Sequence, residues 1–382
     1  MRRFGKFRAG VEFSGGSRSV RGSMNHSALF SPASLGSIAI ANRIVMAPLT
    51  RCRAESGHVP GVLMAEYYAQ RASAGLIICE ATMAIEGNSA FGGAEPGIYS
   101  AAQVAGWRRV TDAVHAKGGR IALQLWHGGR ACHSLLNRGA QPVAPSAVAI
   151  ANDEIHTPEG KKPYETPREL RDEELPGIVA GFRRAAENAK AAGFDGVEVH
   201  GANGYLLDQF LRDGSNRRSG LYGGSVANRA RLLLEVVDAV VAVWGAGRVG
   251  VRISPLNSFN DMRDSDPVAL TRHVAAELDR RGIAFLDLMR SDFFGVQKGD
   301  VVAAARGAFR GALLGGMGFS PSEAAQAVGA GTYAAVVFGH HFISNPDLVD
   351  RVKAGVALVE PDQATFYSPG PRGYTDYPPM AP

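Results

Sequence analysis

The chain has 382 residues, of which 46% are hydrophobic and 20% charged, a composition typical of a soluble globular protein with a sizeable core. It contains no run of about 18 or more apolar residues, and its N-terminus lacks the apolar stretch of a secretory signal. We therefore expect a cytoplasmic protein without a membrane span. Cys52, Cys79 and Cys132 form no CxxC pair or Cys/His cluster, which argues against a disulfide framework and a metal site.

The net charge of +5 is concentrated at the N-terminus. Residues 1–23 carry six basic side chains against the single acid Glu12, so the rest of the chain is neutral. A neutral body carries no basic patch, and we expect neither nucleic acid nor a membrane as partner. Residues 1–24 are rich in Arg, Gly and Ser, which predicts a disordered basic extension with Met24 as a plausible true start, although an organelle transit peptide has the same composition. Residues 25–382 are predicted to form one domain.

The first ordered elements are predicted between residues 29 and 48. Small polar and apolar residues alternate around Gly36, which predicts a hairpin. The hairpin leads into a strand over 44–47 that Pro48 ends.

Seven more short apolar runs follow, separated by amphipathic stretches with a helical period. These predicted strands lie at 76–79, 121–125, 196–199, 249–253, 285–288, 312–314 and 335–338. Helices are expected from near Asp172, from near Ser320 and after Ser225, which is well placed as an N-cap.

Eight strand–helix repeats favour an α/β fold, a (β/α)8 TIM barrel with an N-terminal hairpin, over a doubly wound protein with two domains. The first strand is not followed by the GxGxxG pattern that the doubly wound alternative would require. Long segments at 126–171 and 255–267 are rich in Pro, Gly, Asn and Asp, and we expect them to fold over the barrel mouth.

Three polar side chains, His200, Asn203 and Tyr205, directly follow the predicted strand at 196–199. Loops that leave the carboxyl ends of parallel strands converge on one face, which is where such proteins bind ligands. An imidazole, a carboxamide and a phenol within one turn could hold one polar atom and transfer a proton. In the alternative interpretation, His200 and Asn203 only satisfy backbone groups of a tight Gly-containing loop.

Glycines follow the seventh and eighth predicted strands, at Gly315, Gly316 and Gly339, with His340 next. Barrels commonly bind phosphate there through backbone N–H groups, although Gly-rich turns also serve as simple connections. Few carboxylates and no nucleophile–base pair occur at the strand ends, and the early strands offer no His/Asp cluster. These features argue against a hydrolase and against a metal centre.

Gln124 and Arg252 lie on the third and fifth predicted strands. Beside a phosphate site, a carboxamide and a guanidinium could hydrogen-bond the electron-poor edge of a flat heterocycle. Each could instead be a satisfied polar group of the barrel interior.

Several motifs resemble those of the Old Yellow Enzyme family. They are NRIVMAPLTRCRA from Asn42, LQLWHGGR from Leu123, VEVHGANGYLLDQFL from Val197, YGGSVANRAR from Tyr222 and GYTDYP from Gly373. The resemblance covers about residues 29–378. It implies an FMN-bearing (β/α)8 barrel, with non-covalent cofactor and NAD(P)H as reductant, that reduces activated C=C bonds of enones, enals, maleimides or nitroalkenes.

The resemblance also implies roles for individual residues. His200 and Asn203 would bind the electron-withdrawing group, flavin N5 would supply hydride, and Tyr205 would donate the proton. The residues implied in FMN binding are Pro48, Leu49, Thr50, Ala81, Gln124, Arg252, Gly315, Gly316, Gly339 and His340. The residues implied in the substrate pocket are Trp126, Phe91 and Tyr367.

Two positions depart from the family pattern. His340 stands where relatives usually have Arg beside the FMN phosphate, and Phe91 stands where many have Tyr. Thr50, rather than Cys, places the chain in the Thr-bearing branch. The departures keep open a flavin-binding barrel with altered activity, such as nitro compound or quinone reduction, or a non-catalytic flavin sensor. We expect a monomer or homodimer.

Overall fold

Eight parallel strands form a closed barrel in the computed structural model, which describes residues 26–380. The extension predicted for residues 1–24 lies outside the described residues. The barrel strands, in their spatial order, are β3 (Ile44–Met46), β4 (Leu76–Ile78), β6 (Ile121–Trp126), β11 (Gly196–Gly201), β12 (Val249–Ile253), β13 (Phe285–Met289), β14 (Ala312–Gly316) and β15 (Ala335–Phe338). The pairing of β15 with β3, Val336 opposite Ile44, closes the ring.

All eight predicted barrel strands are confirmed, with ends that shift by at most two residues. Closure of the ring excludes the open, doubly wound sheet considered as the alternative. The strands are short apolar runs because both of their faces are covered, by helices outside and by packed side chains inside.

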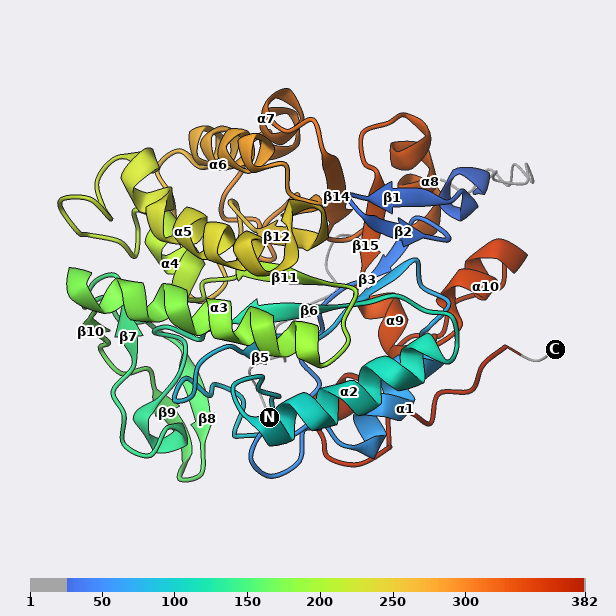
Figure 1. Ribbon diagram of the computed structural model, residues 1–382, viewed down its shortest axis with the longest axis horizontal. Coiled ribbons are helices and arrows are strands. Elements are labelled where there is room, and N and C mark those ends of the chain that lie inside the picture. Colours follow the sequence, from blue (N-terminus) through green and yellow to red (C-terminus); the bar gives the residue numbers. More distant parts are fainter. Residues whose placement is uncertain (1–25, 381–382) are drawn as a thin grey trace.

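Helices cover the outside of the barrel, as Figure 1 shows for α2, α3, α5 and α6. The helices are α1 (Val62–Gln70), α2 (Ala101–His115), α3 (Leu175–Ala191), α4 (Leu206–Leu211), α5 (Val226–Trp244), α6 (Pro267–Arg281), α7 (Val301–Ala308), α8 (Pro321–Gly329), α9 (His340–Ser344) and α10 (Leu348–Ala354). Ser225 and Ser320 accept hydrogen bonds from the backbone N–H groups of Asn228 and Glu323, so both predicted starts are confirmed as N-capped.

The predicted N-terminal hairpin is formed by β1 (Ala33–Leu35) and β2 (Ile38–Ile40). Its apolar side chains join those of the barrel interior in one buried cluster, so the hairpin closes the amino-terminal end of the barrel. Gly36 turns the hairpin with φ +58°, and a Cβ there would lie 2.5 Å from the carbonyl oxygen of Gly247. Only glycine fits this turn.

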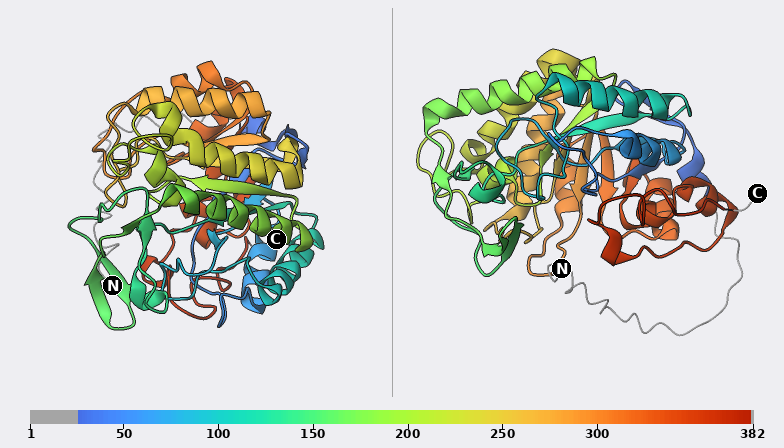
Figure 2. Two further views of the ribbon diagram at one scale, coloured as in Figure 1. Left: turned by 60° about the vertical axis from the view of Figure 1, so that its left-hand side comes forward. Right: turned by 90° about the horizontal axis from the view of Figure 1, so that it is seen from below.

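The long segment after β6 carries short strands of its own. Strands β8 (Glu154–Thr157) and β9 (Gly160–Pro163) form a second hairpin, which projects from the body in green in Figure 2. The remaining short strands are β5 (Thr82–Met83), β7 (Val143–Ala144) and β10 (Arg168–Glu169). The sequence did not reveal the second hairpin, because of its two strands only Ile155 is fully buried and the apolar alternation is weak.

The carboxyl-terminal segment is tied to the loop that follows β3. Arg51, 1% exposed, donates to the carbonyl oxygens of Phe366 and Gly373, at 3.0 and 2.7 Å. Arg53 donates to the carbonyls of Thr365 and Phe366 at 2.9 and 2.7 Å. This clamp brings the end of the chain back to the barrel mouth. Among residues 26–380, no helix has both the length and the apolar character to cross a membrane.

Candidate active site at the barrel mouth

His200 lies at the end of β11 and is 4% exposed. Its Nδ1 accepts a hydrogen bond from the backbone N–H of Ala202 at 3.2 Å, so Nε2 carries the proton of the neutral ring. Burial, aided by the charge of Arg252, lowers the pKa of His200 well below its ordinary 6.5. The satisfied-loop interpretation therefore holds for one ring nitrogen, while the other remains a neutral donor.

Asn203 and Tyr205 follow in the loop that leads to α4. Asn203 adopts a left-handed conformation with φ +57°, which Asn tolerates better than most residues. Its backbone N–H donates to Ser254 Oγ at 2.8 Å, and its side chain is half-buried. The Tyr205 ring lies edge-on to His200 with centroids 5.2 Å apart. The predicted trio is thus brought together at one strand end.

The residues predicted to shape the pocket form a continuous aromatic wall beside this trio. Trp126 meets the Tyr205 ring edge-on at 5.1 Å. Phe91 lies 6.2 Å from Trp126 and is stacked at 6.4 Å on Tyr367, which the arginine clamp delivers from the carboxyl-terminal segment. The wall brings three separate parts of the chain together beside His200, Asn203 and Tyr205.

The barrel interior below the mouth contains several ionisable side chains. Gln124 Nε2 donates to Glu198 at 2.8 Å, and Arg252 Nε lies 3.4 Å from Asp287 without hydrogen-bond alignment. Burial raises the pKa of both carboxyl groups, Glu198 and Asp287, which repel one another. The interior interpretation of Gln124 is therefore partly right, while Arg252 retains an unpartnered buried N–H.

The residues after β3 and β4 form the next part of the rim. Pro48, Leu49 and Thr50 are half-buried, and Ala81 is 6% exposed. Glu80 supports this part by accepting hydrogen bonds from the Arg51 backbone N–H at 3.2 Å and the Tyr68 hydroxyl at 3.0 Å. Burial raises the pKa of Glu80 to about 7.

The two glycines at the end of β14 have different surroundings. Gly316 faces the barrel interior, where a Cβ would lie 3.4 Å from Asp287 Oδ1. Gly315 points to the opposite face, because side chains alternate along a strand, and leaves space there for the Tyr333 ring.

Beyond β14 the chain turns sharply at Met317, with φ +88°, and Gly318, with φ +68°. Arg290 donates to the Met317 carbonyl at 2.9 Å and to the Gly318 carbonyl at 3.4 Å, while Glu323 pairs with its guanidinium. A trans peptide directs its N–H away from its C=O, so the N–H groups of Gly318 and Phe319 point away from Arg290. In the described chain neither of these N–H groups has a hydrogen-bond partner. Such paired N–H groups attract anions.

His340 begins α9, next to Gly339, and is paired with Glu360, their Nε2 and Oε2 atoms 3.0 Å apart. The side chain is 46% exposed. A Cβ on Gly339 would lie 3.3 Å from Leu49 Cδ2, so the eighth and first strand ends are in contact.

The sequence matches the NADH:flavin oxidoreductase / NADH oxidase family over residues 28–358. The chain belongs to this family. It is 52% identical, over 92% of its length and 97% of the relative's, to a Leishmania infantum protein named "Probable flavin mononucleotide-dependent alkene reductase". It is 42% identical to 12-oxophytodienoate reductase 7 of Oryza sativa subsp. japonica, with 92% of this chain and 94% of the relative covered.

Solved structures support the same assignment. Morphinone reductase has a TM-score of 0.89 at 47% identity, with 94% of this chain and 98% of that chain covered. The old yellow enzyme from Trypanosoma cruzi has a TM-score of 0.90 at 44% identity, with 93% of this chain and 100% of that chain covered. The predicted membership of the Old Yellow Enzyme family and the TIM-barrel fold are confirmed, and the chain is a flavin-dependent oxidoreductase.

The residues at the mouth fit FMN, the cofactor of this family. Arg252 Nε is a buried donor without a hydrogen-bond partner, and Gln124 lies two strands away on β6, with β11 between them. A Cβ on Gly318 would meet nothing within 4 Å, so its backbone is open to close approach. The N–H groups of the turn after β14 supply the environment that a phosphate requires. Within the described residues, no cluster of His, Cys, Asp and Glu could hold a metal ion.

Several supporting residues were not found from the sequence. Arg51, Arg212, Asn257 and Arg290 act through partners that are distant in the chain or belong to other loops. The one sequence signal is that Arg51 lies inside the motif from Asn42 and Arg212 directly follows the motif from Val197.

Proposed function

We propose that this chain is an FMN-dependent ene reductase that uses NAD(P)H to reduce small electrophilic alkenes, with His200, Asn203 and Tyr205 acting on the substrate. The observation that carries the proposal is the neutral Nε2–H donor of His200, beside Asn203 and Tyr205 and against an aromatic wall. A flat, apolar substrate with one polar oxygen matches this combination of groups.

Residues on two sides of the mouth would hold the cofactor. Gln124 and Arg252 would bind the pyrimidine edge of the ring, while Pro48, Leu49, Thr50 and Ala81 would line it. The phosphate would be bound by the turn after β14 together with Gly316, Gly339 and His340. Gly315 points to the opposite face of its strand and would contribute through its backbone groups. When bound, FMN supplies the hydride that adds to the β-carbon of the alkene.

His200 and Asn203 would stabilise the charge that develops on the substrate. As the β-carbon is reduced, negative charge accumulates on the carbonyl or nitro oxygen, and donors fixed in advance stabilise it without further reorganisation. A neutral imidazole suits this role because it donates without itself changing protonation state. The α-carbon then requires a proton, and Tyr205 carries the one hydroxyl of the trio.

Trp126, Phe91 and Tyr367 would determine which alkenes fit. Phe91 contributes ring surface without a hydroxyl, so this side of the pocket favours an apolar substituent. We also propose that residues 25–382 act as one FMN-binding domain in the cytoplasm, as a monomer or homodimer.

The test is a combined spectral and kinetic measurement on the purified protein. We expect absorbance bands of bound FMN in the blue and near ultraviolet, and oxidation of NAD(P)H with formation of cyclohexanone from 2-cyclohexenone. A protein that stays colourless after incubation with FMN would overturn the proposal. A yellow protein that reduces only quinones or nitro groups would support the altered-activity alternative.

A further inference from the structure

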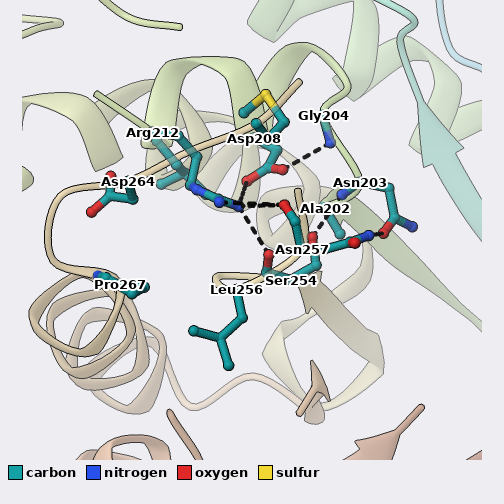
Figure 3. A network of polar contacts seen from close by, with 12 residues as sticks. Ala202, Asn203, Gly204, Asp208, Arg212, Ser254, Leu256, Asn257, Asp264 and Pro267 are labelled. Carbon is teal, nitrogen blue, oxygen red and sulfur yellow. Dashed lines mark hydrogen bonds and ion pairs between the residues drawn. The ribbon is translucent and has the colours of Figure 1, made fainter. Parts of the chain in front are cut away.

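We propose that Asn257 is a positioning residue that fixes the direction of the Asn203 carboxamide. The inference rests on the proposed role of Asn203 as a donor to the substrate oxygen. Asn257 follows β12, on a different loop from Asn203, and is fully buried. Its Nδ2 donates to Asn203 Oδ1 at 2.9 Å (Figure 3).

The direction of Asn257 is itself determined by backbone groups. Its Oδ1 accepts from the N–H of Phe293 at 3.3 Å and more weakly from that of Phe259 at 3.4 Å. Turning the Asn257 amide over would place its NH2 group against these two N–H donors. The NH2 group of Asn257 must therefore face Asn203.

The direction of Asn257 determines which group of the Asn203 carboxamide faces the proposed substrate. Because Asn203 Oδ1 is occupied by Asn257, the two protons on Asn203 Nδ2 remain for other acceptors. The terminal torsion of an Asn side chain has a broad, roughly two-fold preference, so it does not select one direction by itself. In the opposite direction Asn203 would present an acceptor to the substrate oxygen, and the two would repel.

The backbone of Asn203 is held independently of Asn257. Its N–H donates to Ser254 Oγ at 2.8 Å, and its carbonyl accepts from Asn260 Nδ2 at 2.9 Å. Asp208 accepts from the next N–H, that of Gly204, at 2.8 Å. Loss of the Asn257 amide would therefore free the Asn203 side chain without releasing its backbone.

Arg212 holds the loop of Asn257 against the loop of Asn203. It is completely buried, donates to the carbonyls of Ser254 at 3.0 Å and Asn257 at 3.3 Å, and lies 3.8 Å from Asp208. Figure 3 shows these groups between the two loops. A fixed frame of this kind allows one carboxamide to orient another.

Two substitutions of Asn257 separate positioning from packing. Asn257→Leu removes the donor and lets the Asn203 amide turn, so kcat/KM for 2-cyclohexenone should fall about fivefold, the worth of one neutral hydrogen bond. Asn257→Asp is closer in shape, but its carboxylate draws the Asn203 NH2 group toward itself and turns Oδ1 toward the substrate. We expect a larger fall, more than about tenfold. A purely structural role predicts the reverse order.

The Asn203→Gly background distinguishes positioning from a direct charge effect. Glycine adopts the left-handed conformation at 203 without strain, so the loop is retained. If Asn257 acts through the Asn203 amide, Asn257→Asp should change kcat/KM by less than about twofold in this background, a double-mutant cycle with strong coupling. An undiminished effect of the aspartate in Asn203→Gly would overturn the proposal, as would parent-like activity of Asn257→Asp.

A second readout does not depend on turnover. In ¹⁵N–¹H spectra, the side-chain NH2 signals of Asn203 can be assigned by their loss in Asn203→Gly. They should exchange with solvent in the parent and become protected in Asn257→Asp, where they bond the carboxylate. Equal exchange in both proteins would refute the positioning role. If the two proteins differ in exchange as expected but the parent reduces no enone, only the proposed function is contradicted.

Discussion

Two sides of the barrel mouth satisfy their backbone groups in opposite ways. We call the loop of His200, Asn203 and Tyr205 the donor side, and the turn after β14, where we propose that the FMN phosphate binds, the phosphate side. On the donor side, Asn203 is left-handed but its N–H and carbonyl are both bonded, to Ser254 and Asn260. On the phosphate side, Met317 is also left-handed, yet the N–H groups that follow it have no partner in the described chain. The donor side is complete within the protein, and in the proposed function the bound cofactor would complete the other side.

This difference indicates where each side obtains its order. In the proposed function the donors must be in place before the transition state, and neighbouring loops supply the hydrogen bonds of Asn203 in advance. A cofactor that remains bound can contribute its own hydrogen bonds to the loop that holds it, and binding free energy then adds to folding stability. Substitutions on the two sides should therefore affect different measurements.

Tyr205→Phe should produce the largest effect, and on the donor side only. Reoxidation of the NAD(P)H-reduced enzyme by 2-cyclohexenone should slow by about 100- to 10,000-fold, the usual contribution of a positioned general acid. FMN affinity and the rate of reduction by NAD(P)H should stay at parent values, because neither requires a proton at the α-carbon. Stopped-flow measurement of both half-reactions gives the comparison. Parent-like reoxidation by the enone would show that another group donates the proton.

Arg290→Met should affect the phosphate side alone. Without the guanidinium, the carbonyls of Met317 and Gly318 lose their common donor, so the N–H groups on the other side of the turn lose their alignment. We expect the Kd of FMN to rise about tenfold. Riboflavin, which has no phosphate, should bind as in the parent, and Arg310→Met, an exposed arginine elsewhere, serves as the control. Equal weakening of both flavins would indicate general loss of structure instead.

His340→Arg should improve the phosphate side by a smaller amount. A guanidinium offers a charged fork of donors where the imidazole offers at most two separate N–H groups. The Kd of FMN, measured by quenching of flavin fluorescence in the apoprotein, should fall about fivefold. Unchanged affinity would mean that the backbone N–H groups already provide the phosphate binding.

The smallest effect is an absence of pH dependence on the donor side. Burial keeps the pKa of His200 well below 6.5, so the ring becomes protonated only in acid well below that value. The Kd of 2-cyclohexenone for the oxidised enzyme should therefore vary less than about twofold between pH 6 and pH 8, where the neutral donor is retained. A transition centred near 6.5 would show that His200 titrates like an exposed histidine.

The barrel and the clustering of the candidate site residues at one strand end could be predicted from the sequence because their signals are local. Each strand is an apolar run, and His200, Asn203 and Tyr205 lie within six residues of one strand end. The groups that hold them could not be predicted, because Asn257 reaches Asn203 across 54 residues of chain. Arg51 and Gly373 meet across 322 residues. Such pairs form only once the fold places their loops together.

Electrostatic surroundings were equally out of reach from the sequence. Gln124 and Arg252 were identified as candidate ligand-binding residues, but nothing in the sequence marked Glu198 and Asp287 as their neighbours in the barrel interior. A carboxyl group becomes significant only when its burial and its neighbours are known.

The arginine clamp on the carboxyl-terminal segment bears on how substrate preference can diversify. Arg51 and Arg53 bond the main-chain carbonyls of residues 365, 366 and 373 and also lie over the rings of Phe366 and Tyr374, so these contacts of the clamp do not involve the Tyr367 side chain. Tyr367 therefore occupies a position where the pocket wall can be exchanged without loss of its attachment. Position 367 can thus be varied on a segment whose path is fixed, which makes it a natural starting point for laboratory evolution of new selectivity.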